Sequence, residues 1–341
     1  MSYKLAITIA GAVSLGSFEA GVLFEVLDTL YERTLQEIGR VLAVSLLLFN
    51  SPWAPCGTVV LKKAFVAHYK DRATIDASFV VDHAHKKPNP PVKDGDMHIA
   101  CRAPKEIGLP MVAEVMNAAR TQEQVAVNRI HAVEGDGSPV PVSGAWRLWF
   151  EHPADSQTQF DPVAVAANTN PHHSFEIHPI TRFDGDDLSA SFQQIPGFQP
   201  YAASKAFASN ERMVVTLSAT PSAISITSKK SGYNYVQVRI QLKGTPKKLE
   251  DDGYAAVADV FDTGSKDTED SILENVRMIF VPNTPPLQQL ISSRLGDGDS
   301  LNVIGIPRVN LSAIYAFVAA SSGRPSTRKL PYEMIIVAVT K

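Results

Sequence analysis

The first 56 residues contain two apolar stretches with different patterns. Residues 4–10 form a short apolar run rich in β-branched side chains, which predicts a buried strand. Apolar positions then recur at helical spacing over residues 18–30, with Ser17 in the N-cap position. We therefore expect a strand, a glycine loop and a helix within residues 1–32.

The second apolar stretch, residues 41–49, is uninterrupted and follows a charged segment. It is too short to cross a bilayer, which requires about 20 residues, so no transmembrane segment is expected. Residues 33–56 fit either a buried helix or a signal-like segment. The signal would place the protein in the periplasm or outside the cell, and the helix would leave it cytoplasmic.

Between residues 57 and 190, short apolar runs alternate with Pro, Gly and Asp clusters, which is typical of a mainly β chain. Helices are expected over residues 110–119, where Met111, Val112, Val115 and Met116 would share one face, and over residues 122–133. Strands are expected at residues 77–81, 97–101, 145–150 and 174–178. This pattern favours an OB-like barrel with an inserted helix.

Residues 191–341 also have a β pattern, after a connecting segment over residues 191–207. The expected strands are residues 213–217, 223–227, 233–242, 255–261, 277–281, 301–306 and 332–339. Their spacing indicates a second β-sandwich or barrel domain. The predicted fold class is thus mainly β with minor α, preceded by a short βα segment, with divisions at residues 1–32, 33–56, 57–190 and 191–341.

Composition and charge narrow the functional classes. The chain has 341 residues, of which 45% are apolar and 20% charged, as in ordinary folded domains. A net charge of −3 provides no overall field for a polyanion, so there is no strong nucleic-acid signal. All 9 histidines lie between His68 and His178. That distribution indicates that the middle of the chain differs chemically from its end.

Two segments in the middle of the chain have the spacing of metal ligands. In an extended chain, alternate side chains share a face, so each segment would present imidazole or carboxylate groups together. Mixed nitrogen and oxygen ligands suit Zn²⁺, Mn²⁺ or Fe²⁺. The alternative is a solvated strand face with a hairpin turn at Asp94-Gly95. The candidate metal ligands are His83, His85, Asp94, Asp96 and His98.

A second group of candidates surrounds two similar strand ends, Phe150-Glu-His-Pro and Phe175-Glu-Ile-His-Pro. Proline ends each strand, which would place histidine and glutamate at a barrel rim. Alternation puts Arg147 and Trp149 on one face, where an aromatic ring can stack on a ligand or belong to the core. The candidate ligand-binding residues are Arg147, Trp149, Glu151, His152, Glu176 and His178.

Residues 5–30 resemble the start of patatin-like phospholipases, in which a strand leads into a glycine-rich oxyanion loop and a helix. The resemblance implies an oxyanion loop from Gly11 to Gly16 and acyl-transfer chemistry. It covers under a tenth of the chain. No serine has glycine at both the −2 and +2 positions, so the nucleophile elbow of that chemistry is absent.

Residues Phe175-Glu-Ile-His-Pro-Ile-Thr181 and the chain around them resemble exported bacterial proteins of unassigned function, which implies no particular activity. The first functional hypothesis is a two-domain protein that binds a ligand or protein partner. A metal-dependent hydrolase of the phosphodiester class, using the His/Asp segments, is the second. A degenerate patatin-like acyl hydrolase is the third, and no catalytic residue is assigned.

Overall fold

The computed structural model describes residues 56–250, 252–263 and 270–340, which lie in one compact unit, Pro55–Lys341. The predicted strand, loop and helix of residues 1–32, with Gly11 and Gly16, lie outside the described residues. So does nearly all of the signal-like segment, residues 33–56. These expectations for residues 1–56 therefore stay predictions.

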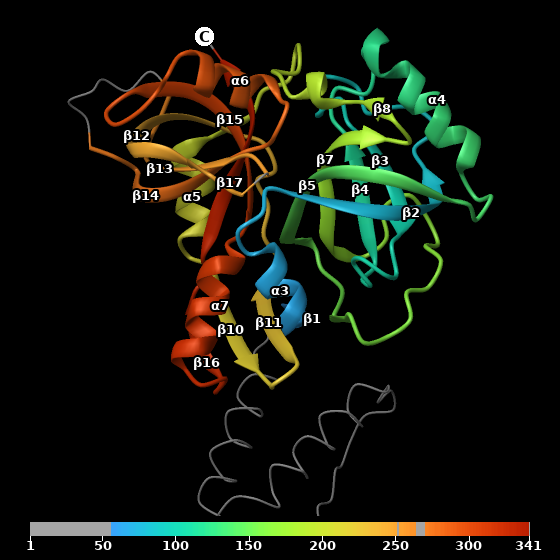
Figure 1. The fold of residues 1–341 in the computed structure, drawn as a ribbon, viewed down its shortest axis with the longest axis horizontal. Helices are drawn as coiled ribbons and strands as arrows, with labels where there is room; N and C mark the ends of the chain where they lie inside the picture. The colour runs from blue at the N-terminus through green and yellow to red at the C-terminus, as the bar shows by residue number, and fades with distance from the viewer. Residues whose placement is uncertain (1–55, 251, 264–269, 341) are drawn as a thin grey trace, which may run out of the picture. The chain divides into compact units, whose positions relative to one another are not determined.

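Five strands close into the first barrel (Figure 1). Their order is β4-β3-β2-β5-β7, and the barrel closes where β4 pairs with β7 in parallel. The short strand β8 pairs antiparallel with the end of β7, and helix α4 stands between β4 and β5 in the chain. The bounds are β2 Thr74–Ala84, β3 Met97–Arg102, β4 Met111–Val115, α4 Gln124–Val133, β5 Pro139–His152, β7 His173–Phe183 and β8 Asp186–Asp187.

Side-chain alternation explains the interior of this barrel and leaves an unusual exterior. Met111, Ala113 and Val115 of β4 belong to the apolar core, as do Phe175 and Ile177 of β7. The residues between them must face outward, yet every residue of β4 is buried. Polar side chains on this outer face are therefore covered by another part of the protein.

The second barrel repeats the connectivity of the first. Its strand order is β13-β14-β17-β15-β12, with β12 closing on β13 and β14 parallel to β17. A helix, α6, again stands between the third and fourth strands. The bounds are β12 Val236–Lys248, β13 Tyr254–Phe261, β14 Leu273–Phe280, α6 Pro285–Ser292, β15 Ser300–Val309, α7 Leu311–Ala320 and β17 Tyr332–Thr340.

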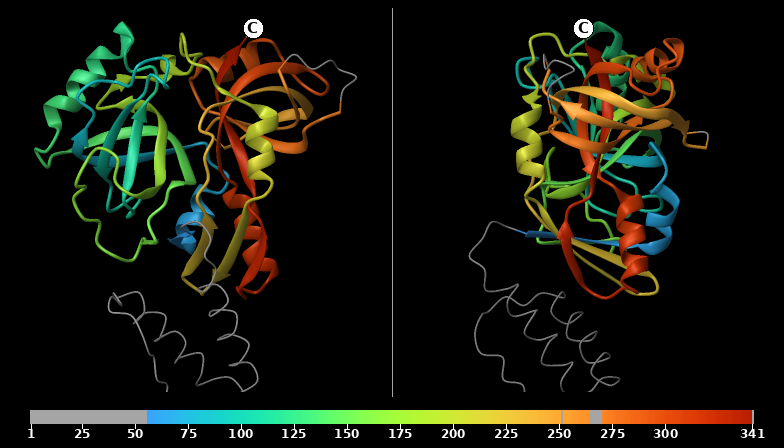
Figure 2. Two further views of the ribbon diagram at one scale, coloured as in Figure 1. Left: turned by 180° about the vertical axis from the view of Figure 1, so that it is seen from behind. Right: turned by 90° about the vertical axis from the view of Figure 1, so that its left-hand side faces the viewer.

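A third sheet lies at one end of the barrel pair (Figures 1 and 2). Its order is β16-β10-β11-β1-β6, so it combines strands from both sides of residue 190. The predicted boundary separates the barrels but crosses this sheet. The bounds are β1 Cys56–Lys62, α3 Lys63–Tyr69, β6 Ser156–Thr158, β10 Val214–Ala219, β11 Ala223–Lys229 and β16 Ser326–Lys329.

Short elements connect these parts. Helix α5 packs through Ala203, Ala206 and Phe207 on the core of the second barrel. In the described part of the chain, no helix is both long and apolar enough to cross a membrane. The bounds are η1 Thr121–Glu123, η2 Ser189–Ser191, β9 Tyr201–Ala202 and α5 Ala203–Asn210.

The structure confirms a mainly β fold with one barrel that carries an inserted helix and a second barrel after it. The helix predicted over residues 122–133 is present as α4. The helix predicted over residues 110–119 is wrong, because Met111–Val115 form the fully buried strand β4. Because this strand is buried on both faces, its sequence lacks the strict polar–apolar alternation that would distinguish it from a short helix.

Candidate functional site

A cluster of titratable side chains occupies the covered outer face of the first barrel. Asp96 precedes β3, Glu114 lies on β4 and His178 lies on β7. Each offers one ligand atom, and these atoms lie within 4.8 Å of one another. The three side chains are at most 5% exposed. Strand pairing thus brings together residues that are up to 82 positions apart in the sequence.

The contacts in this cluster join histidine, carboxylates and a tyrosine. His178 Nε2 lies 3.2 Å from Asp96 Oδ2 and 3.7 Å from Glu114 Oε2. The Tyr235 hydroxyl donates to Asp96 Oδ2 at 2.5 Å and lies 2.9 Å from His178 Nε2. Asp96 Oδ1, Glu114 Oε2 and His178 Nδ1 have no hydrogen-bond partner among the described residues. Such buried, unpartnered atoms are costly unless a further group binds them.

A second network adjoins the cluster on β5 and β7. The Arg147 guanidinium donates to Glu176 at 2.5 Å and to Glu151 at 3.1 Å. His173 Nε2 lies 3.2 Å from the other Glu176 oxygen, at hydrogen-bond distance. Glu176 Oε2 is also 3.7 Å from His178 Nδ1, so the two networks meet at this carboxylate.

These surroundings shift the protonation of the groups strongly. Burial raises the pKa of Glu114 to about 8, against the opposing charge of His178. Burial alone would lower the pKa of His178, but Glu114 and Asp96 outweigh it and raise this pKa to about 10. Burial also raises the pKa of Asp96. Despite burial, Arg147 holds the pKa of Glu176 well below its usual range.

Two further histidines, His98 and His85, lie between the cluster and solvent. His98 Nε2 lies 3.3 Å from Glu114 Oε2, and the His98 side chain is 16% exposed. The His85 ring stacks on the His98 ring with centroids 4.6 Å apart and planes at 9°. Burial lowers the pKa of both imidazoles, which favours their neutral, metal-binding form.

The chain matches no protein-family model and no curated protein. The geometry of the candidate site and the chemistry of its side chains indicate what it can bind. The site combines a convergent set of nitrogen and oxygen atoms with burial of ligand atoms that lack hydrogen-bond partners among the described residues.

The structure separates the predicted metal ligands. Asp96 is in the cluster, His98 lies beside Glu114, and His85 stacks on His98. Asp94 instead accepts hydrogen bonds from the Asn89 side chain and the Asp96 backbone, so it shapes the local turn. His83 lies on β2 beside an irregularity in the β2–β3 register, and it is not one of the three clustered residues.

The predicted ligand-binding residues are divided as well. His178 belongs to the cluster, and Arg147 and Glu176 form the adjoining network with Glu151. The remaining two residues, Trp149 and His152, differ in their exposure to solvent. The Trp149 indole is fully buried and donates to the Gly232 carbonyl, so it does not offer a surface for stacking. His152 is 37% exposed and stacks on the His173 ring.

Glu114 and Tyr235 were absent from the candidates suggested by sequence. Glu114 falls in the segment predicted as a helix, where it would have been one polar side chain on a solvated face. Tyr235 lies 57 residues after His178, just before β12. No local spacing connects it with Asp96, so only the folded chain reveals the contact.

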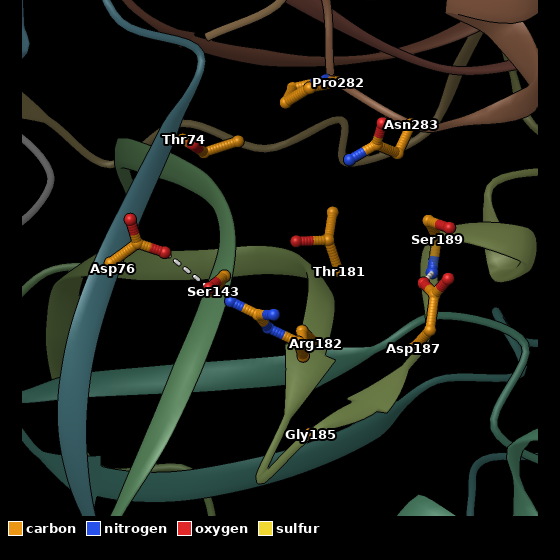
Figure 3. Close-up of a pocket in the computed structure, with 10 residues that line it drawn as sticks. All are labelled: Thr74, Asp76, Ser143, Thr181, Arg182, Gly185, Asp187, Ser189, Pro282 and Asn283. Atoms are coloured by element: carbon orange, nitrogen blue, oxygen red, sulfur yellow. Dashed lines mark hydrogen bonds between the residues drawn. The ribbon is translucent and has the colours of Figure 1, made fainter. Parts of the chain in front are cut away.

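A polar cleft of about 370 Å³ lies elsewhere, between the first barrel and the loop after β14 (Figure 3). Figure 3 shows the Asp76 carboxylate bonded to the Ser143 hydroxyl across neighbouring strands. The Asp187 carboxylate accepts from the Ser189 backbone. None of the predicted site residues that the structure describes lines this cleft, which is bounded by Thr74, Asp76, Ser143, Thr181, Arg182, Gly185, Asp187, Ser189, Pro282 and Asn283.

Proposed function

We propose that this protein is a two-barrel metal-binding protein whose ion is held by Asp96, Glu114 and His178. The observation that carries the proposal is the convergence of three ligand atoms within 4.8 Å at a fully buried position. A second observation supports it, since Glu114 Oε2 has no hydrogen-bond partner among the described residues. A cation at this position would satisfy that oxygen and the neighbouring ligand atoms.

The balance of charge in the cluster also favours a cation. Three buried carboxylates, from Asp96, Glu114 and Glu176, lie in and beside the cluster, and Arg147 is the arginine that donates to one of them, Glu176. The raised pKa values of Glu114 and His178 mean that protons supply the missing positive charge. A divalent ion would replace those protons, as metals do when they bind titratable ligands.

The ligand types and their burial indicate which ion and which role. One imidazole and two carboxylates suit Zn²⁺ or Mn²⁺ better than ions that require thiolates. A catalytic metal keeps a position open for substrate, whereas these side chains are at most 5% exposed. The burial therefore favours a metal that stabilises the fold or is stored over a metal that hydrolyses a phosphodiester.

We also propose that both barrels are OB-like. In each barrel the third and fifth strands pair in parallel, and a helix stands between the third and fourth strands. OB folds bind ligands on the face of their second and third strands. In the first barrel these strands are β3 and β4, which carry His98 and Glu114 outward. The proposed metal would thus occupy the ligand face of an OB-like barrel.

Metal binding by the full chain tests the proposal. Protein stripped with a strong chelator is titrated with Zn²⁺ and Mn²⁺ by calorimetry, and bound metal is measured by mass spectrometry. We expect one ion per chain. Glu114→Gln removes one ligand charge with little change in shape and should weaken binding by about 10–100-fold.

Glu123→Gln provides the matched control. Glu123 is also buried, at 1% exposed, but it lies before α4 and is not one of the clustered residues. This variant should bind metal as the unaltered protein does. Failure of the unaltered chain to bind either ion, or equal affinity in Glu114→Gln, would refute the proposed function.

A further inference from the structure

Tyr235 is placed where a metal ligand would be needed. Its hydroxyl lies 2.5 Å from Asp96 Oδ2 and 2.9 Å from His178 Nε2, and both atoms are in the candidate ligand set. The side chain is 1% exposed. The phenol oxygen thus faces the same buried point as the carboxylates and the imidazole.

The separations fit a four-ligand arrangement after a small expansion. Ligand atoms around a tetrahedral zinc ion, with bonds of about 2.0–2.2 Å, lie about 3.3–3.6 Å apart. His178 Nε2 is 3.2 Å from Asp96 Oδ2 and 3.7 Å from Glu114 Oε2. The two contacts of the Tyr235 oxygen are shorter, as expected for hydrogen bonds that an ion would replace.

Tyr235 comes from a different part of the fold than the other three residues. It directly precedes β12, the first strand of the second barrel. It belongs to a buried apolar cluster that also contains Ile304 and Ile335 of that barrel, and Met116 and Ala145 of the first. A ligand at this position would connect the two barrels through one ion.

We propose that Tyr235 is the fourth ligand of the metal held by Asp96, Glu114 and His178, so that the ion bridges the two barrels. This inference rests on the proposed metal site. On binding, a bond forms between the ion and the phenol oxygen as the hydroxyl proton passes to solvent. The proton held by Glu114 and the Nε2 proton of His178 leave in the same way, and no electron is transferred.

The test compares Tyr235→Phe with Tyr233→Phe in the full chain. Tyr233 lies two residues earlier and has its ring against Tyr201, at 5.0 Å between centroids. We expect Tyr235→Phe to bind Zn²⁺ about 10–100-fold more weakly than the unaltered protein. Tyr233→Phe should keep the original affinity. Circular dichroism establishes that both variants are folded.

Copper provides a signature that a purely structural tyrosine would not give. The Cu²⁺-loaded protein should show a visible phenolate-to-copper charge-transfer band, which Tyr235→Phe should lose and Tyr233→Phe should keep. Equal or tighter zinc binding by Tyr235→Phe would overturn the fourth-ligand assignment while leaving the metal site intact. Weaker binding with no charge-transfer band in the unaltered protein would also overturn it. If the unaltered protein binds no metal, the proposed function fails as well.

Discussion

Glu114 and His178 each hold a proton at neutral pH because of their surroundings. Burial raises the pKa of Glu114 to about 8, and neighbouring carboxylates raise that of His178 to about 10. In the unfolded chain both groups return to their ordinary values, below 7. Between the unfolded and the folded pKa of each group, the folded, metal-free protein therefore binds more protons than the unfolded chain. Folding becomes less favourable as pH rises through this interval.

The stability of the chelated protein should accordingly fall by several kcal/mol as pH rises from about 4.5, where Glu114 titrates in the unfolded chain, to about 10, where His178 titrates in the folded protein. Urea unfolding at several pH values measures the effect. Glu114→Gln should make the free energy of unfolding depend less steeply on pH below about pH 8, because the substituted side chain has no proton to lose. A stability that is constant or rises over the whole range would contradict this account.

Metal should reverse the direction of this pH dependence. Ligand atoms must lose their protons before they coordinate, so affinity increases as pH rises. The protein with excess Zn²⁺ should thus gain stability from the ion over the range in which the chelated protein loses it. The residue-scale chemistry of Glu114 and His178 links both behaviours to the same two protons.

At the scale of the strands, the sequence predicts elements more reliably than it predicts the site. Most expected strands are present, such as Met97–Arg102 and Tyr332–Thr340. Their sequences could be recognised because they contain alternating positions or runs of β-branched residues. Strand β4 was mistaken for a helix because all five of its residues are buried. That error concealed Glu114, whose outward direction follows only from a strand.

The site also depends on register between strands that are distant in sequence. Glu114 is opposite His98, which follows from the pairing of β3 with β4. His178 joins them only because β7 closes the barrel beside β4. Spacing within one segment identified Asp96 and His98, but the partners from other strands required the closed topology.

Gly144 shows how tightly β5 and β7 are joined beside this site. A Cβ atom at Gly144 would lie 2.4 Å from Ile177 Cγ2 and 2.7 Å from the Pro179 carbonyl oxygen. Because Ile177 and Pro179 flank His178, Gly144→Ala should displace β7 and destabilise the fold by about 1–3 kcal/mol. It should also weaken metal binding.

Thermal unfolding and zinc titration measure these two effects. Gly296→Ala is the control, since a Cβ atom there meets nothing within 4 Å. It should leave both melting temperature and affinity close to those of the unaltered protein. If Gly144→Ala has no larger effect than this control, the close approach of β5 and β7 is not required for the site.

For the whole molecule, two arginines from opposite barrels form reciprocal contacts. Arg147 of the first barrel donates to the Pro307 carbonyl of the second at 3.0 Å. Arg308 of the second donates to the Trp146 carbonyl of the first at 3.0 Å, and its guanidinium carbon lies 3.6 Å from the centre of the Trp146 ring. Both arginines are fully buried. These contacts hold together the surfaces of the two barrels that enclose the cluster of Asp96, Glu114 and His178.

Arg308→Met should therefore weaken the coupling between the barrels. It removes the Arg308 contacts to the first barrel and its 2.7 Å bond to Glu333, at an expected cost of about 3–5 kcal/mol. If the barrels then unfold separately, denaturant curves followed by fluorescence and circular dichroism will no longer coincide. Arg328→Met, which removes an arginine stacked on Phe317 instead, should preserve a single transition. Coincident curves and unchanged stability in Arg308→Met would show that other contacts couple the two barrels.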